Sequence, residues 1–417
     1  MLLKRNIQEK VNKWLNKEEI IVLNGPRQVG KTSLLKLLQN ELILRKIKKE
    51  QIFYLNLEKL EVLNDLNKSP QNLLSYITIK NKKAYFLLDE IQYLDNPSNF
   101  LKHIYDEYRD KVKLIVTGSS SLELKAKLQN SLAGRKISFM VNPLCFEEFL
   151  RFKKTDLLNY YHKGNIPLEI KNKMKELLDE YLLFGGMPKV VLTDGEEAKK
   201  ILLKNYVSDY INKDVRYIGK IDSLLKFNQL VKILANQIGD LLNINEMSNT
   251  LNIPREKIEF YLDLLEYTFI FNKVIPYYKN IRSQITKMPK IYWADLGIRN
   301  QILDNFTGLA GRSDNGKLFE NFVYLELKNK MNKEKIYFYR TTHKTEIDFI
   351  FEKNGVVYPI EAKYKDFSRP TGSRILSGFC NNKAINCPAA YMVNINLNQK
   401  YGKIIFLDFI NLSIGGF

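Results

Sequence analysis

The sequence is poor in the residues that build metal sites and disulfide frameworks. Its 417 residues include only three cysteines and three histidines. The cysteines are Cys145, Cys380 and Cys387, and neither their spacing nor that of the histidines resembles a zinc site. We therefore expect three buried, small hydrophobic side chains in a protein of a reducing compartment.

Long apolar runs are also absent. No stretch of 18 or more apolar residues occurs, so the sequence predicts no membrane-spanning helix. The N-terminal segment MLLKRNIQEKVNKWL mixes charged and apolar residues and lacks the continuous apolar run of a signal peptide. The expected location is the cytoplasm, without membrane association.

Positive charge is in excess, with a formal net charge of +19. Such an excess favours a polyanionic partner, either nucleic acid or an anionic membrane surface. An AT-rich genome, which enriches Lys, Asn and Ile together, would give the same composition, so charge alone does not identify the partner. The length and the ordinary hydrophobic fraction of 45% are typical of a globular protein with two to four domains.

The first third of the chain alternates short apolar runs with helical patterns. Five runs read as strands, at residues 20–24, 52–58, 84–90, 113–119 and 136–142. Strands that are apolar on both faces are typical of a parallel sheet covered by helices. The predicted class is therefore α/β, with a nucleotide-binding domain over residues 1–145.

A phosphate-binding loop follows the first of these strands. The match to G-x-x-x-x-G-K-[ST] consists of Gly25, Pro26, Arg27, Gln28, Val29, Gly30, Lys31 and Thr32, and Ser33 follows it. Glycines let backbone N–H groups surround phosphates, Lys31 is placed to reach the β and γ phosphates, and the Thr32 hydroxyl is placed to coordinate magnesium. The loop opens a helix, whose N-terminus attracts anions. The sequence predicts ATP and Mg²⁺ as cofactors.

Five further residues are candidates for roles in hydrolysis. Asp89 and Glu90 end the third strand, where Asp89 can hold magnesium and Glu90 can polarise the attacking water. Thr117 or Ser119, at the end of the next strand, could sense the γ-phosphate, or could simply cap a helix. Arg135 is the candidate arginine finger, in cis or in trans, with a structural ion pair as the alternative.

Helical patterns fill the middle of the chain. Residues 146–223 read as a helical lid, and residues 224–289 as a winged-helix-like segment. In the latter, the first turn of helix Pro254–Tyr267 carries Arg255, Glu256 and Lys257, where a recognition helix usually contacts bases. One more helical packing module is the alternative. Residues 290–417 alternate strands and helices as a separate α/β domain, with a hairpin turn at Gly355.

Motifs along nearly the whole chain resemble one family. They are GPRQVGKT, LLDEIQYL, VTGSSS, LAGRK, NPLCFEEF and FGGMPKVV, followed by KIYWADLGIRN, GKLFENFVYLEL and EIDFIF. This set looks like the bacterial and archaeal AAA+ ATPases that join an AAA-type core to a C-terminal domain of unknown function. The resemblance implies ATP binding, a winged-helix segment and a C-terminal restriction-endonuclease-like domain.

The C-terminal domain contains a candidate nuclease site. Asp348 in EIDFIF and Glu361 and Lys363 in PIEAKY match the D…(D/E)-x-K arrangement, and the resemblance adds Glu320 on the preceding helix. In a strand, Glu361 and Lys363 face the same side. Asp348 and Glu361 would bind Mg²⁺ or Mn²⁺, and Lys363 would orient or deprotonate water. The alternative is an ion pair of Lys363 with one of the carboxylates, in a domain that only binds.

Two functions remain open from the sequence. One is a DNA-acting ATPase whose tail could cleave duplex DNA. The other is a nucleotide-dependent switch or scaffold with an inactive nuclease-like domain. Neither reading fixes the oligomeric state, and a homo-oligomer stays open.

Overall fold

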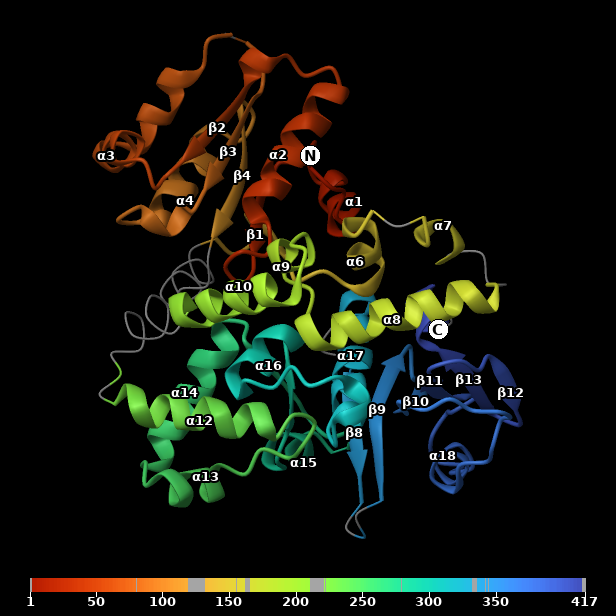
Figure 1. Cartoon of the computed structure of the whole chain (residues 1–417). Helices are drawn as coiled ribbons and strands as arrows, with labels where there is room; N and C mark the ends of the chain where they lie inside the picture. Colours follow the sequence, from red (N-terminus) through yellow and green to blue (C-terminus); the bar gives the residue numbers. More distant parts are fainter. Residues whose placement is uncertain are drawn as a thin grey trace. The chain divides into compact units, whose positions relative to one another are not determined.

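The computed structural model shows a chain of two compact units (Figure 1). It describes residues 2–79, 81–118, 132–154, 156–161, 166–210, 221, 223–278, 280–331, 336–341, 343 and 345–414, apart from the side chains of 281, 283, 285, 413 and 414. The first unit contains Met1–Asn142, Lys213–Gly219 and Tyr267–Phe269, and the second contains Pro143–Asn212, Lys220–Glu266 and Ile270–Phe417. Segments that the sequence divided into a lid, a winged-helix-like segment and a C-terminal domain thus share one compact unit.

The first unit is built on a parallel five-stranded sheet, as predicted. Its strands are β1 (Ile20–Asn24), β2 (Ile52–Asn56), β3 (Ala84–Asp89), β4 (Val112–Gly118) and β5 (Lys136–Met140). Their order is β2-β3-β4-β1-β5, and every neighbouring pair is parallel. All strands therefore end at one edge of the sheet, which we call the carboxyl edge, and begin at the opposite, amino edge.

Helices cover both faces of this sheet (Figure 1). They are α1 (Ile7–Asn12), α2 (Lys31–Leu44), α3 (Leu60–Lys68) and α4 (Pro97–Tyr108), with short 3-10 turns at Lys49–Gln51, Pro70–Tyr76 and Ile91–Tyr93. Ile20 and Val22 of β1 join the apolar core that includes Leu66 of α3 and Leu101 of α4. Ile21 and Leu23, which face the opposite side of β1, are also fully buried, so this strand serves a helical layer on each face.

The second unit begins with helices. In chain order they are α6 (Phe146–Phe152), α7 (Leu158–Tyr161), α8 (Leu168–Phe184), α9 (Pro188–Val191), α10 (Glu196–Asp209), α12 (Leu224–Asn236), α13 (Ile244–Leu251), α14 (Arg255–Tyr267), α15 (Ile281–Thr286), α16 (Leu296–Leu303), the 3-10 turn η5 (Leu309–Gly311) and α17 (Asn315–Lys330). Between them lies a two-stranded antiparallel sheet of β6 (Phe271–Val274) and β7 (Lys290–Trp293).

A mixed six-stranded sheet ends the chain. Its strands are β8 (Ile336–Arg340), β9 (Glu346–Lys353), β10 (Val356–Ala362), β11 (Ala390–Asn394), β12 (Gln399–Tyr401) and β13 (Ile404–Asp408), joined by α18 (Arg374–Cys380) and followed by α19 (Phe409–Ile414). Their order is β12-β13-β11-β10-β9-β8. β9 and β10 form the predicted hairpin, whose turn residues Asn354 and Gly355 both have positive φ.

The predicted boundary at residue 290 lies inside a sheet. Lys290–Trp293 pairs with Phe271–Val274, so the boundary would separate two hydrogen-bonded strands. The chain between them also pairs with β8, because Tyr277 N–H donates to Phe338 O and Phe338 N–H donates to Ile275 O. These non-local hydrogen bonds join the winged-helix-like segment to the C-terminal sheet.

Two of the family-like motifs contact each other in the second unit. Asp295 of ADLGIRN caps α16 by accepting from Ile298 N–H, and its other oxygen accepts from Gly186 N–H of FGGMPKVV at 2.7 Å. The Asn300 side chain donates to the carbonyls of Leu182 and Leu183 at the end of α8. Side chains of α16 therefore donate hydrogen bonds to the last carbonyl groups of α8, so these motifs stabilise the fold of the second unit.

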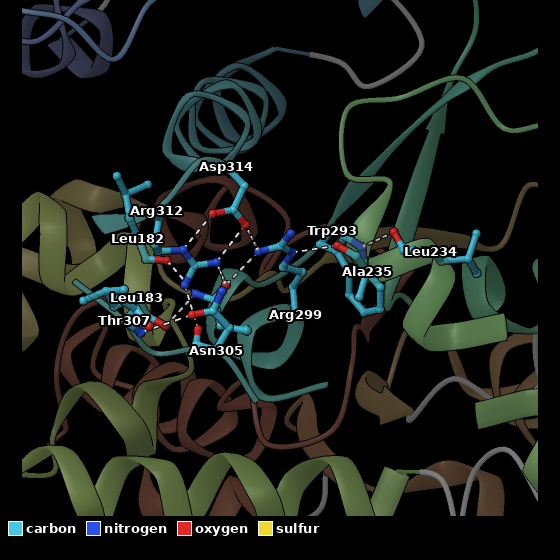
Figure 2. A network of polar contacts seen from close by, with 11 residues as sticks. Leu182, Leu183, Leu234, Ala235, Trp293, Arg299, Asn305, Thr307, Arg312 and Asp314 are labelled. Atoms are coloured by element: carbon cyan, nitrogen blue, oxygen red, sulfur yellow. Dashed lines mark hydrogen bonds and ion pairs between the residues drawn. The ribbon is translucent and has the colours of Figure 1, made fainter. Parts of the chain in front are cut away.

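Two buried arginines extend this network (Figure 2). Arg299 and Arg312 both bind the carboxylate of Asp314, with shortest distances of 2.6 and 2.7 Å. Arg299 also donates to Ala235 O of α12. Although burial opposes it, the two guanidinium groups lower the pKa of Asp314 to about 2. This charge pairing fixes α16 to α12 and to the start of α17.

Replacement of Gly297 by alanine should destabilise the second unit by about 2–3 kcal/mol. A Cβ at this position would lie 2.0 Å from the carbonyl oxygen of Phe184, which is backbone and cannot swing aside. Urea unfolding followed by circular dichroism measures the effect. Gly316→Ala is the matched control, because nothing lies within 4 Å of its added Cβ; equal stability of the two variants would show that α8 and α16 are not held this closely.

The cysteines are buried as expected, but two of them are paired. Cys145 is buried outside any disulfide, and Cys380 and Cys387 form a disulfide. The sequence interpretation of three unpaired thiols is therefore corrected for this pair, which the structure brings together by a return of the chain after α18. In the part of the chain that the structure describes, no helix has the length and apolarity needed to cross a membrane.

Candidate functional site

The predicted phosphate-binding loop lies at the carboxyl edge of the first sheet, between β1 and α2. Its backbone needs glycine at two points. Gly25 has φ of 156°, and a Cβ there would lie 2.2 Å from Val141 O; Gly30 is left-handed with φ of 92° at the start of α2. Arg5 is buried and donates to Val29 O and Asn142 O at 2.8 Å each, which ties the loop to the end of β5.

Lys31 is folded into this loop. It is 5% exposed, and its Nζ donates to the carbonyls of Gly25 and Pro26 at 2.9 and 2.8 Å. The first turn of α2 has no side-chain cap. The backbone N–H groups of this turn lie beside the Lys31 ammonium, as expected from the sequence for a phosphate-binding loop. Thr32 is half-buried beside it, while Ser33 and Gln28 are exposed.

Asp89, Thr117 and Glu90 form a hydrogen-bonded chain next to the loop. Strand β4 lies between β1 and β3, so Thr117 stands between the phosphate loop and Asp89. The fully buried Thr117 Oγ1 donates to Asp89 Oδ1 at 2.5 Å and accepts from Glu90 N–H at 2.9 Å. The other Asp89 oxygen accepts from Tyr54 OH of β2 at 2.8 Å.

Glu90 has an unusual backbone. Its φ of 59° and ψ of 55° are left-handed, a conformation that non-glycine residues seldom adopt. The Thr117 hydroxyl supports this conformation by binding the Glu90 N–H. The Glu90 carboxylate contacts the side-chain amide of Gln92. Tyr54 and Gln92 were not predicted from the sequence. A tyrosine within β2 and a glutamine after β3 are common in strands and loops that have no functional role.

Arg135 lies at the other edge of the sheet. Its carbonyl accepts from the N–H of Ile20, the first residue of β1, whereas the phosphate loop follows Asn24, the last. Four strand steps separate these ends, about 13 Å. The Arg135 guanidinium pairs with Asp106 at 2.6 Å and lowers the pKa of that carboxyl. Arg135 therefore does not reach the phosphate loop of its own chain. Ser119 lies outside the described residues.

Substitution of Thr117 by valine should slow ATP turnover about tenfold, a typical effect of one lost positioning contact. Valine has the same shape but neither donates to Asp89 nor accepts from Glu90 N–H, so both acidic groups lose a fixed position. Phosphate release at saturating ATP measures the rate, and Thr117→Ser is the control that keeps the hydroxyl. Unchanged turnover in Thr117→Val would exclude a role for this contact.

The second unit brings the predicted nuclease residues together. The register of β9 and β10 pairs Phe349 with Ile360, which places Asp348 opposite Glu361 on the same face. Asp348 Oδ2 accepts from Ala362 N–H at 2.8 Å. Lys363 Nζ binds Glu361 Oε2 at 2.8 Å, which is the ion pair that the sequence offered as the alternative to catalysis.

A lysine not predicted from the sequence lies within this cluster. Lys290, at the start of β7, is 2% exposed and binds Glu320 Oε1 at 3.2 Å and Glu346 Oε1 at 2.5 Å. Tyr292 OH donates to the same Glu320 oxygen at 2.6 Å. Burial disfavours the Lys290 charge, but the surrounding carboxylates outweigh it and raise the pKa of Lys290.

Lysine and arginine side chains compensate most of the acidic charge in this cluster. Four carboxylates face three cations, because Arg340 also pairs with Glu346. Among the described residues no group of three or more His, Cys, Asp or Glu side chains is placed to hold a metal ion. The side chains as they stand do not fit a Mg²⁺ or Mn²⁺ ion, whose oxygen ligands would have to leave these partners.

Glu320 gives the cluster a pH dependence. Burial and the nearby Asp348 raise the pKa of Glu320 to about 7. A carboxyl whose pKa is raised on folding stabilises the folded state when it is protonated, and this stabilisation is lost as the pH rises from about 4.5 to about 7. Glu320→Gln, which cannot ionise, should remove this loss. Urea unfolding of both proteins at pH 5 and pH 8 measures it; an equal pH response in both would contradict the assignment.

Known families match successive parts of the chain. The family described as "AAA domain" matches residues 17–150, which cover the sheet, the phosphate loop, Asp89 and Thr117. Two families described as "Domain of unknown function", DUF8612 and DUF4143, match residues 175–308 and 315–410. The first unit therefore contains an AAA domain, and DUF8612 spans the predicted boundary at residue 290.

Solved structures give only weak overall similarity. A RuvB structure from Thermotoga maritima is 15% identical with a TM-score of 0.29, covering 65% of this chain and 90% of that chain. An AMPPCP-bound DnaA from Aquifex aeolicus is 16% identical with a TM-score of 0.28, covering 64% and 89%. No conclusion rests on scores this low.

Relatives extend over most of the chain. An "Uncharacterized protein" of Haemophilus influenzae is 26% identical over 88% of this chain and 87% of its own length. "Uncharacterized protein MJ1544" of Methanocaldococcus jannaschii is 30% identical over 81% of this chain and 73% of its own length. On this similarity, the chain belongs to the same protein family as MJ1544.

Proposed function

We propose that the first unit binds ATP with Mg²⁺ and hydrolyses it. The observation that carries the proposal is the chain Asp89–Thr117–Glu90, which stands beside a phosphate loop whose lysine is already buried in it. An acid held by two hydroxyl groups and a second acid fixed one residue later are the parts that phosphoryl transfer to water requires.

Each residue has a defined task in this proposal. The loop N–H groups and Lys31 would bind the β and γ phosphates, and Thr32 and Asp89 would hold magnesium. Magnesium would neutralise charge on the phosphates as the γ-phosphoryl group leaves. Glu90 orients and polarises the attacking water. Thr117 would sense the γ-phosphate, because its hydroxyl donates to the Asp89 carboxylate and accepts from the backbone N–H of Glu90.

Arg135 can serve only a neighbouring chain in this scheme. Its position at the amino edge and its pairing with Asp106 argue against a role at its own phosphate loop. A homo-oligomer that brings Arg135 to the loop of a second copy would make it an arginine finger in trans. If the protein hydrolyses ATP as a monomer, the ion pair with Asp106 is the only role of Arg135.

For the second unit we propose binding rather than cutting. The predicted nuclease carboxylates are engaged by Lys290, Lys363 and the Ala362 N–H. A nuclease with a second Mg²⁺ or Mn²⁺ would need these contacts to break. The restriction-endonuclease-like fold remains an expectation from the family resemblance, and the engagement of these carboxylates by other groups favours a domain that has no hydrolytic role.

Duplex DNA is the partner that we propose on the net charge, although α14 is a poor candidate for the contact. Its exposed side carries Glu256, Glu259, Asp263 and Glu266, and Arg255 is paired with Glu259 at 2.9 Å. The positive charge of Arg255 and Lys257 is therefore largely offset on α14, which weakens the prediction that this helix contacts DNA. A winged-helix-like order of helices and strands can also serve packing, as the pairing with β8 shows.

One set of assays tests the proposal. ATP turnover is measured with and without duplex DNA, and the same DNA is examined for cleavage in Mg²⁺ and Mn²⁺. The expected result is measurable turnover, stimulation by DNA and no cleavage. Tight nucleotide retention with very slow turnover would instead favour the nucleotide-dependent switch, and cleavage that Asp348→Ala abolishes would contradict the binding role of the second unit.

A further inference from the structure

The amino edge of the first sheet collects basic residues, and four of the five loops that enter it carry a net positive charge in their described residues. The described residues of these loops are 16–19, 45–51, 81–83, 109–111 and 132–135, and they contain ten Lys or Arg and four Asp or Glu residues. Because the five strands are parallel, all five loops lie at the same edge, opposite the phosphate loop. We call these ten basic residues the amino-edge array.

The array is held in order along the sheet by hydrogen bonds between neighbouring loops. Gln51 donates to Lys83 O, Ala84 N–H donates to Lys111 O and Ile20 N–H donates to Arg135 O, at 2.8 to 2.9 Å. Lys113, which is fully buried at the start of β4, donates to Lys17 O at 2.8 Å. The backbone beneath the basic side chains is therefore fixed.

Most of the array is exposed and uncompensated. Three of its residues have acidic partners, since Arg45 pairs with Glu41, Arg109 with Glu18 and Arg135 with Asp106. The other seven are Lys17, Lys46, Lys48, Lys49, Lys82, Lys83 and Lys111, and within the described part of the chain none of them pairs with a carboxylate. All seven are exposed or half-buried.

A buried lysine, Lys113, lies beneath the array. Burial, and after it the charge of Lys83, lower the pKa of Lys113 to about 7. By contrast, α14 presents four acidic residues and only Arg255 and Lys257 as basic ones. Of these two surfaces, the amino edge is the one that attracts a polyanion.

We propose that the amino-edge array is a nucleic-acid backbone site, which binds the phosphates of duplex DNA on the side of the AAA domain away from its phosphate loop. The inference deepens the proposed function, because it rests on a nucleic-acid partner. Neighbouring strands are about 4.8 Å apart, so five loops span about 19 Å. A duplex presents one phosphate per ~3.4 Å along each strand, so this length meets about six phosphates of one strand.

The chemistry of the site implies binding without sequence preference. Lysine ammonium groups on exposed loops contact phosphate oxygens and carry no base information. Such contacts release counterions, so affinity should fall linearly with the logarithm of salt concentration, with a slope of about 0.9 per phosphate neutralised. A duplex of any sequence should bind, and added salt should release it.

The test is a comparison of three variants on a fluorescent 20-base-pair duplex. Lys48→Gln/Lys49→Gln/Lys82→Gln removes three charges of the array. Lys353→Gln/Lys383→Gln/Lys400→Gln removes three exposed lysines of the second unit and is the matched control. Arg255→Gln/Lys257→Gln tests α14. All three sets change exposed or half-buried side chains, and basal ATP turnover without DNA should be unchanged in each.

The array variant should lose at least about tenfold in affinity at 100 mM salt and about 2.7 in salt slope. The control and the α14 variant should stay within about threefold of the unaltered protein. Equal binding by the array variant, or a loss confined to the α14 variant, would overturn the site. Binding to phosphatidylserine vesicles but not to the duplex would also overturn it, in favour of a membrane surface.

The same samples separate this inference from the proposed ATPase. If the protein hydrolyses ATP but binds no duplex at low salt, the array inference fails and the ATPase proposal stands. If the duplex binds through the array and no ATP is hydrolysed, the array stands and the ATPase proposal fails.

Discussion

Substitution of Lys31 by alanine should lower ATP turnover at least about a hundredfold, which corresponds to about 2.7 kcal/mol of transition-state stabilisation. The Lys31 ammonium is the cation that the structure buries inside the phosphate loop, where it binds Gly25 O and Pro26 O. Its removal leaves the β and γ phosphates with no ammonium in that position, so both nucleotide affinity and turnover should suffer.

Lys36→Ala is the matched control for this experiment. Lys36 lies on the same helix α2 but is exposed. It should retain turnover within about twofold, since exposed substitutions on a helix usually have small effects. Phosphate release and binding of a fluorescent ATP analogue measure the two variants. Turnover in Lys31→Ala equal to that in Lys36→Ala would mean that ATP is not bound at this loop.

Substitution of Lys290 by alanine should destabilise the second unit by about 3–5 kcal/mol, the usual cost when one partner of a buried ion pair is removed. Lys290 is 2% exposed and binds both Glu320 and Glu346. Without it, these carboxylates and Asp348 remain close together with less positive charge between them, and each raises the energy of the others.

Lys287→Ala is the control, because Lys287 lies three residues earlier and is exposed. Urea unfolding followed by circular dichroism gives the free energies. A second variant, Lys290→Met with Glu320→Gln, removes opposite charges together and should recover part of the loss. A destabilisation below about 1 kcal/mol in Lys290→Ala would show that the cluster does not depend on this lysine.

The nucleotide-binding architecture could be predicted because its signals are local. Strands that are apolar on both faces indicate a parallel sheet, and the loop motif between β1 and α2 fixes where phosphate binds. The position of Thr117 between the two motif strands also follows from a strand order that the structure confirms. Tyr54 could not be recognised in the same way, because it contacts Asp89 on the neighbouring strand, 35 residues away in the sequence.

Other features depend on contacts that sequence patterns do not report. Lys290 opens a short strand, a place where lysine is usually solvated, and only the pairing of β7 with β6 and the packing of α17 bury it. The predicted boundary at residue 290 falls at the start of β7, which pairs with β6 on the other side of that boundary. The position of Arg135 at the amino edge could have been predicted from the sequence, because the chain must return to that edge before it enters a parallel strand.

The measurement that tests the central claim most directly is ATP hydrolysis by the unaltered protein and by Glu90→Gln, with nucleotide binding measured beside it. Glu90→Gln keeps the size of the side chain and the backbone N–H that binds Thr117, and it removes only the carboxylate that polarises water. We predict that both proteins bind ATP with similar affinity and that turnover falls at least about a hundredfold in the variant. Equal turnover in the two proteins, or no ATP binding by either, would contradict the account.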